Sequence, residues 1–343
     1  MSVQLPGKFA YGTMSMTWTP EPISHEQAFE CLSHVIEKHG VNFIVGGEFY
    51  GPDDANMKMT EEFWKKYGDK YPDLIVSLKA GFNLEKFCPD GSQESVAKSI
   101  KQFASHFPKE KSKRPKLIFE VARVDPTISY EKTIGYISEF VKQGVIDGIS
   151  ISEVGAGSIQ KAISVAPISA IEVEFHLLCE DILTNGVLAE AAKHDIPVIA
   201  YSPLCRGFLT EFAINDLDNF YKLSNRPGDV RANCDKFVGD NFWHNAKRVK
   251  ALQEFAHKKG TTLESLSLSW IIAVGGQENF FGIPKLPKIM PITSGTSASK
   301  IDRNLGSPVQ LTRADLEEIN KINEAHPVKG YRYTKEAEAL SFA

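Results

Sequence analysis

The chain has 343 residues, which is enough for one large α/β domain or two average domains. Hydrophobic residues make up 42% and charged residues 24%, as in ordinary globular proteins. The formal net charge of −4, from 39 basic and 43 acidic residues, argues against a nucleic-acid or anionic-membrane partner.

The cysteines and histidines are scattered along the chain. Neither a CxxC pair nor an HExxH motif occurs, so the pattern predicts no disulfide framework and no metal site. No apolar run approaches the roughly 20 residues that span a bilayer, and the N-terminus lacks the pattern of a secretory signal. We therefore expect a protein of the cytoplasm, with the nucleus as a second location.

Short apolar runs recur along the chain and predict strands. Amphipathic stretches separate them, as in parallel sheets covered by helices. A weak eighth run comes late, before the last helix. The runs are NFIV (42–45), LIVSLKA (74–80), LIFEVAR (117–123), IDGISIS (146–152), ISAIEVEF (168–175), IPVIAYSP (196–203), KIMPIT (288–293) and SPVQLT (307–312).

The stretches between the runs predict helices. In residues 24–40 an apolar stripe includes Leu32 and Val35, and Gly40 ends the helix. Residues 130–144 and 182–195 have similar patterns. A last helix begins after Thr312, which is a typical N-cap residue.

About eight strand–helix units in this length predict a single (β/α)8 TIM barrel domain over residues 1–343. A doubly wound sheet is disfavoured, because no GxGxxG follows the first strand. The apolar segment at about 5–20 could plug one barrel end. The polar stretch at about 211–248 breaks the rhythm and predicts a loop excursion over the barrel mouth.

Residues at the carboxyl ends of the strands share one mouth of such a barrel. Tyr50 follows the Gly46-Gly47 pair after the first of these strands, and Lys79 lies near the end of the next. An ammonium lowers the pKa of a nearby phenol, so the pair could act as a proton donor. Taken singly, Tyr50 is better explained as an aromatic packed against the barrel rim, and Lys79 as a solvated lysine.

Four segments resemble the aldo-keto reductase family over about residues 10–325. They are GTMSMTW (12–18), GVNFIVGGEFYG (40–51), GVIDGISISE (144–153) and IPVIAYSPLCRGFLT (196–210), and the last is the most specific. The resemblance implies that Tyr50 is the catalytic proton donor and that Lys79 lowers its pKa. Hydride would pass from a nicotinamide to a carbonyl carbon.

Two catalytic positions of that family do not match. Its aspartate aligns with Val45 and its histidine with Ala122. The segments GGEFYG and ARVD (122–125) instead resemble the fungal pyridoxal reductase branch, in which the missing pair is a subfamily trait. Gly46 and Gly47 would then leave room for a flat substrate ring. Without the aspartate, the charge of Lys79 could be paired with Glu48, although a solvated loop carboxylate is the favoured interpretation of Glu48.

The resemblance also implies the cofactor site. Tyr201 would stack on the nicotinamide, while Ser152, Glu153 and Glu172 would lie at its carboxamide. A carboxylate cannot donate to the carboxamide oxygen, so that recognition would be incomplete. The remaining residues would line the cofactor from the opening segment and from the turn around the pyrophosphate: Gly12, Thr13, Met14, Ser202, Pro203, Leu204, Arg206 and Gly207.

Residues 292–306 match the family segment that holds the adenosine end. Lys300 and Arg303 supply positive charge beside the small donors Ser294, Thr296 and Ser297, and Asn304 is kept for the adenine. With no carboxylate aligned at the ribose, these donors favour a 2′-phosphate, and so NADPH.

The sequence therefore predicts an NADP-dependent oxidoreductase of vitamin B6 metabolism that reduces pyridoxal to pyridoxine. Two alternatives stay open. One is a cofactor-binding regulatory protein like the potassium-channel β subunits of the family, and the other is a reductase of other carbonyls. We expect a monomer or weak oligomer.

Overall fold

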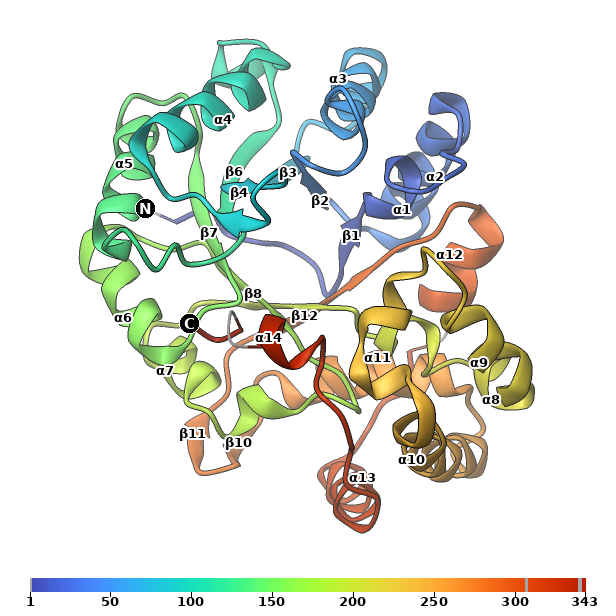
Figure 1. The fold of residues 1–343 in the computed structure, drawn as a ribbon. Coiled ribbons are helices and arrows are strands. Elements are labelled where there is room, and N and C mark those ends of the chain that lie inside the picture. Colours follow the sequence, from blue (N-terminus) through green and yellow to red (C-terminus); the bar gives the residue numbers. More distant parts are fainter. Residues whose placement is uncertain (1, 306–307, 339–340) are drawn as a thin grey trace.

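The computed structural model describes residues 2–305, 308–338 and 341–343. Eight parallel strands close into a barrel with helices around it, in the order β1-β12-β9-β8-β7-β6-β3-β2 (Figure 1). The predicted (β/α)8 architecture is confirmed. The barrel strands are β1 (Ala10–Gly12), β2 (Phe43–Gly47), β3 (Ile75–Ala80), β6 (Lys116–Val121), β7 (Gly148–Ser152), β8 (Ala170–Glu174), β9 (Val198–Tyr201) and β12 (Ile289–Thr293).

The eighth strand lies at the N-terminus, where the sequence predicted a plug. In β1, Tyr11 pairs with Ile44 and Ala10 pairs with Ile292, which closes the barrel between β2 and β12. A strand of three residues is too short to show alternation. Val3 and Leu5, which precede it, pack against apolar side chains of the barrel interior. The weak strand predicted at 307–312 is wrong at 308–312, where no strand forms, and Ser307 lies outside the described residues.

The helices between the strands form the outer ring. The helix ends that the sequence predicted are capped by local hydrogen bonds and backbone geometry. In the helix at 25–39, Ser24 accepts a hydrogen bond from the Gln27 amide, and Gly40 ends the helix with φ +64°. Thr312 and Asp315 form a capping box. The helices are α1 (Met14–Thr17), α2 (His25–His39), α3 (Ala55–Tyr67), α4 (Gln93–Ser105), α5 (Tyr130–Lys142), α6 (Ala156–Val165), α7 (Val187–Lys193), α8 (Glu211–Asn215), α9 (Leu217–Ser224), α10 (Gly239–Lys258), α11 (Leu263–Val274), α12 (Ala298–Leu305), α13 (Arg313–Ala325) and α14 (Lys335–Glu338).

The stretch 211–248 is only partly the loop excursion that the sequence predicted, because helices flank a segment of turns and short 3-10 helices at 225–238. It holds α8, α9 and the first half of α10. Aromatic side chains bind it to the end of β9: the Phe208 and Phe242 rings stack with centroids 4.8 Å apart, and Phe220 stacks on Phe208 at 5.5 Å. The helices were not predicted, because most residues of this stretch are polar and only a few aromatic residues anchor it.

The C-terminal segment returns to the barrel after α13. In Figure 1, α14 lies in front of the strand ends, in red. The Gly155 amide, just after β7, donates to the Ala343 carbonyl at 2.9 Å, so the chain ends at the carboxyl ends of the strands. Two small hairpins, β4 (Phe82–Asn83) with β5 (Cys88–Pro89) and β10 (Glu278–Phe280) with β11 (Ile283–Lys285), complete the fold. Among the described residues, no helix is both long and apolar enough to cross a membrane.

Candidate active site

Tyr50 and Lys79 lie together at the carboxyl ends of neighbouring strands. Gly47, the last residue of β2, is paired with Lys79 of β3, and Tyr50 follows in the turn after β2. The Lys79 ammonium lies 5.6 Å from the ring centroid of Tyr201, at the end of β9. The structure therefore brings together the predicted proton donor, its lysine and the predicted nicotinamide platform.

Two buried acidic side chains surround Lys79 in place of the missing aspartate. Its ammonium forms an ion pair with Glu172 of β8 and lies 3.3 Å from Glu120 of β6. Both carboxylates are almost completely buried. Glu172 thus pairs with the lysine, although the sequence placed it at a carboxamide.

Sequence reasoning missed Glu120. A signal was present, because Glu120 interrupts an apolar strand two residues before Ala122, and alternate strand residues share a face. The pairing of Lys79 with Glu48 is wrong. The Glu48 carboxylate accepts hydrogen bonds from the Ser99 hydroxyl at 2.8 and 2.9 Å.

Burial shapes the ionisation of this group. The pKa of Tyr50 is raised to about 12. Burial is the largest cause, and together with the nearby acids Glu172 and Glu120 it outweighs the lowering by Lys79. Lys79 does lower the pKa of Tyr50, as the sequence predicted. The net pKa is nevertheless raised, so the predicted lowering of the overall value is wrong. Burial and the neighbouring Glu120 also raise the pKa of Glu172 to about 8, in spite of Lys79. The phenol is therefore protonated across the neutral range.

Aromatic rings hold Tyr50 in place. Trp18 stacks on it with ring centroids 5.6 Å apart, and Phe49 meets it edge-on at 5.3 Å. A Cβ on Gly47 would lie 2.8 Å from the Tyr50 ring, and one on Gly46 would lie 2.4 Å from Asn56 Oδ1. The space above the glycines is filled by these side chains, so the prediction that it receives a substrate ring is wrong.

Glu153 belongs to a buried ion network. Arg332 of the C-terminal segment bonds both its carboxylate oxygens, at 2.7 and 3.2 Å, and Arg123 lies 3.3 Å away. Burial alone would raise the pKa of Glu153, but Arg332 and Arg123 outweigh it and lower that pKa. Arg332 also contacts Glu174 and Glu338. Glu153 therefore anchors the chain terminus, and its predicted place at a carboxamide is not supported by these contacts.

The C-terminal segment also reaches the predicted nicotinamide platform. The phenols of Tyr201 and Tyr333 lie 2.9 Å apart. The guanidinium of Arg206 lies 5.0 Å from the ring centroid of Tyr333. Sequence reasoning missed Arg332 and Tyr333, since they follow the last periodic helix and belong to no motif.

The turn after β9 has a backbone suited to an anion. Ser202, Cys205 and Arg206 have φ of +52°, +47° and +51°, and Gly207 follows at +94°. Such backbones turn amide groups toward one concave side. The buried Nη2 of Arg206 has no hydrogen-bond partner among the described residues. An orphaned guanidinium nitrogen beside this turn fits a phosphate group. Pro203 and Leu204 complete the turn.

The remaining predicted cofactor residues lie in two places. Thr13 is buried and bonds Asn56 Oδ1 at 3.0 Å, whereas Met14 is exposed. Gly12 ends β1, and Ser152 ends β7 opposite Glu172. At the predicted adenosine end, the Lys300 ammonium lies 3.4 Å from the Thr296 hydroxyl and Asn304 Nδ2 donates to the Ser294 carbonyl at 3.0 Å. Lys300, Arg303 and Ser294 are exposed on or just before α12, next to Ser297.

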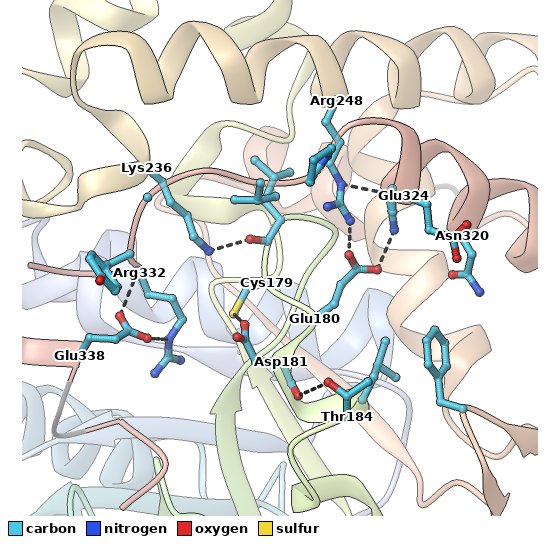
Figure 2. A pocket seen from close by; sticks show the side chains of 18 residues that line it. Cys179, Glu180, Asp181, Thr184, Lys236, Arg248, Asn320, Glu324, Arg332 and Glu338 are labelled. Carbon is cyan, nitrogen blue, oxygen red and sulfur yellow. Dashed lines mark hydrogen bonds and ion pairs between the residues drawn. The ribbon is translucent and has the colours of Figure 1, made fainter. Parts of the chain in front are cut away.

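A separate cavity lies behind the C-terminal segment (Figure 2). Its lining includes Lys236, whose ammonium donates to the Leu178 carbonyl at 2.6 Å. Asn323 accepts from Arg248 at 3.0 Å and donates to Glu180 at 2.6 Å. Neither Tyr50 nor Lys79 lines it, and several of its polar groups bond one another, so we interpret it as a structural network.

The fold and this site define a (β/α)8 barrel whose reactive groups gather at the carboxyl ends of the strands. The chain belongs to the aldo/keto reductase family, whose model matches residues 8–324. It is 32% identical over 338 residues to the Schizosaccharomyces pombe protein named "Probable pyridoxal reductase 2", covering 97% of this chain and 96% of that protein. A Saccharomyces cerevisiae protein provisionally named a pyridoxal reductase is 33% identical over 340 residues, with 94% of each chain covered.

Solved structures support the fold. A glycerol dehydrogenase from Gluconobacter oxydans superposes with a TM-score of 0.73 at 16% identity, over 96% of each chain. A thermostable aldo-keto reductase in complex with the inhibitor epalrestat superposes with a TM-score of 0.65 at 18% identity, over 92% of this chain and 94% of that one. At such identities the likeness is one of fold.

Proposed function

We propose that this protein is an NADPH-dependent reductase of an aromatic aldehyde, and that pyridoxal is reduced to pyridoxine. The observation that carries the proposal is the Tyr50–Lys79 pair, which lies at the strand ends beside Tyr201. The two yeast relatives whose names refer to pyridoxal reductase support the substrate. The cytoplasmic or nuclear location and the monomeric or weakly oligomeric state stay predictions.

Several groups of this chain suit NADPH. The Tyr201 ring offers a stacking face, and Arg206 offers an unpartnered nitrogen to the pyrophosphate. Lys300 and Arg303 offer exposed positive charge to a 2′-phosphate. The cofactor, when bound, supplies a hydride to the carbonyl carbon.

Tyr50 supplies the proton that completes the reduction. As negative charge develops on the carbonyl oxygen, that oxygen becomes a stronger base than a phenolate, so Tyr50 gives up its proton even though burial raises its pKa to about 12. The carbonyl carbon gains the hydride and the oxygen gains the proton, which yields the alcohol. The Lys79 ammonium stabilises the phenolate left behind.

Loss of NADPH absorbance on adding pyridoxal tests the proposal. We expect consumption of one NADPH per pyridoxine formed, and a much smaller rate with NADH. Tight NADPH binding without turnover of pyridoxal or of a panel of other aldehydes would instead favour a cofactor-binding regulatory protein. Turnover of other carbonyls alone would keep the reductase and remove pyridoxal as its substrate.

A further inference from the structure

Three potential metal ligands meet on the outer face of the barrel. His34 and His39 belong to α2 and Asp302 belongs to α12, and the two helices pack against each other (Figure 1). Nε2 of His34 lies 2.8 Å and Nε2 of His39 lies 2.9 Å from the same oxygen, Oδ1 of Asp302. The three ligand atoms all lie within 4.8 Å of one another. Two imidazoles and a carboxylate therefore converge on one point.

The two nitrogen-to-oxygen spacings are close to those of a metal site, and the two histidine nitrogens lie within 4.8 Å of each other. Zinc is bound tetrahedrally at about 2.0–2.1 Å by histidine nitrogen and carboxylate oxygen, so its ligand atoms stand about 3.3 Å apart. The two nitrogen-to-oxygen distances need to widen by only a few tenths of an ångström. The side chains of His34, His39 and Asp302 keep 25%, 11% and 35% of their surface exposed, which leaves a path for the ion.

We propose that His34, His39 and Asp302 form a binding site for a divalent transition metal ion such as Zn²⁺, which fastens α12 to α2. The three side chains supply the protein ligands, and water completes the tetrahedron. Lys38 is the competitor, since its ammonium lies 2.8 Å from Oδ2 of Asp302. Its side chain is 55% exposed and can swing into solvent when an ion binds.

The position of the site links it to the predicted cofactor end. Asp302 lies on α12 between Lys300 and Arg303. A second tie joins α2 to the loop just before α12, because Gln27 on α2 donates to the Thr296 carbonyl at 2.6 Å. An ion here would fix the helix that carries the positive charge. Metal binding itself does not depend on the proposed reaction.

A second cluster of ligand types, Glu174, His176 and Cys179, is a poor competitor. All three residues are buried. Burial leaves an ion no path to these residues, and the Cys179 thiol already donates to Asp181 at 3.2 Å. It serves as an internal control.

Titration of the full chain, free of any histidine tag, with Zn²⁺ in a calorimeter tests the proposal. We expect one ion per chain, with binding weakened on the order of ten-fold or more in His34→Ala and His39→Ala, because two ligands hold an ion far less well than three. His25→Ala is the matched control: His25 lies on the same helix but pairs with Glu62 at 2.6 Å. It should bind as wild type does.

Lys38→Ala makes the test sharper, because removal of the competing ammonium should tighten Zn²⁺ binding several-fold. Circular dichroism would show that each variant is folded. Absence of binding, wild-type affinity in both His34→Ala and His39→Ala, or loss of binding only in Cys179→Ser would each overturn the proposal.

Discussion

Lys79 on β3 is ion-paired with Glu172, which lies three strands away around the barrel on β8. Because Glu120 also lies 3.3 Å from Lys79, two buried carboxylates share one ammonium. One carboxylate Oε2 of Glu172 has no hydrogen-bond partner among the described residues. A full negative charge on both acids is therefore costly, and a proton is retained.

Glu172→Gln should change how stability depends on pH. The pKa of Glu172 is raised from 4.5 to about 8, so between these values the folded state holds a proton that the unfolded state has released. The contribution of Glu172 to stability is therefore complete below about pH 4.5 and is lost as pH rises toward 8. Urea unfolding from pH 5 to 8.5 should show a falling free energy of unfolding in wild type and a flatter profile in the variant. Parallel profiles would contradict this protonation.

Arg332→Met should destabilise the protein by about 3–5 kcal/mol, the usual cost of removing one partner from a buried ion pair. Glu153 would be left buried with only Arg123 beside it, since Arg332 bonds both its carboxylate oxygens. The double variant with Glu153→Gln should cost less than the sum of the two single changes, because neither charge remains. Urea unfolding of all four proteins gives the coupling, and strict additivity would show that the pair contributes nothing.

The sequence predicted the parts of the site that follow from strand ends. Tyr50 follows one apolar run and Lys79 lies near the end of the next, and parallel strands bring the ends of such runs to one mouth. Glu172 could also be placed at the mouth. Its partner could not, because a carboxylate facing the barrel interior can meet any cation that reaches there. The local sequence pattern does not show which side chains meet across the barrel.

Other features could not be predicted from the sequence, for different physical reasons. β1 has three residues, so alternation had no room to appear. Arg332 and Tyr333 act through tertiary contacts made by an irregular segment after α13, and no periodicity marks such contacts. The aromatic anchors of the 211–248 stretch, such as Phe220, were diluted by polar neighbours. In each case packing overrides the composition of a short segment.

Lys300→Ala should weaken NADPH binding by about 1–3 kcal/mol, the scale of a lost charge-assisted contact, with little effect on NADH. Lys300 is exposed on α12, so the fold should be unchanged. Lys321→Ala on α13 is the charge-matched control. Fluorescence titration with both cofactors measures the effect, and equal losses for NADPH and NADH would remove the assignment of Lys300 to the 2′-phosphate.

Tyr50→Phe deletes the phenolic proton and keeps the stacked ring against Trp18. Turnover of pyridoxal should fall by on the order of 100-fold to 10,000-fold, the usual loss for a positioned general acid. NADPH affinity and the urea midpoint should change little. Tyr331→Phe, which alters an exposed tyrosine, is the control. Near-normal turnover in Tyr50→Phe would move the search for the proton donor to water or to another mouth residue.

Gly47→Ala tests whether the position of the phenol, as well as its presence, determines the rate. The added Cβ would lie 2.8 Å from the Tyr50 ring, so the ring must shift away from Gly47. A displacement of a few tenths of an ångström moves the phenol from its place beside Lys79. Since catalysis by a positioned acid falls steeply with misplacement, we expect turnover to drop by on the order of ten-fold to 100-fold. Gly157→Ala is the matched control, because a Cβ there meets nothing within 4 Å. Steady-state kinetics with pyridoxal should show the loss mainly in kcat, because the added methyl group touches the proton donor. Equal kcat in Gly47→Ala and wild type would mean that the glycine serves only to let the chain turn after β2.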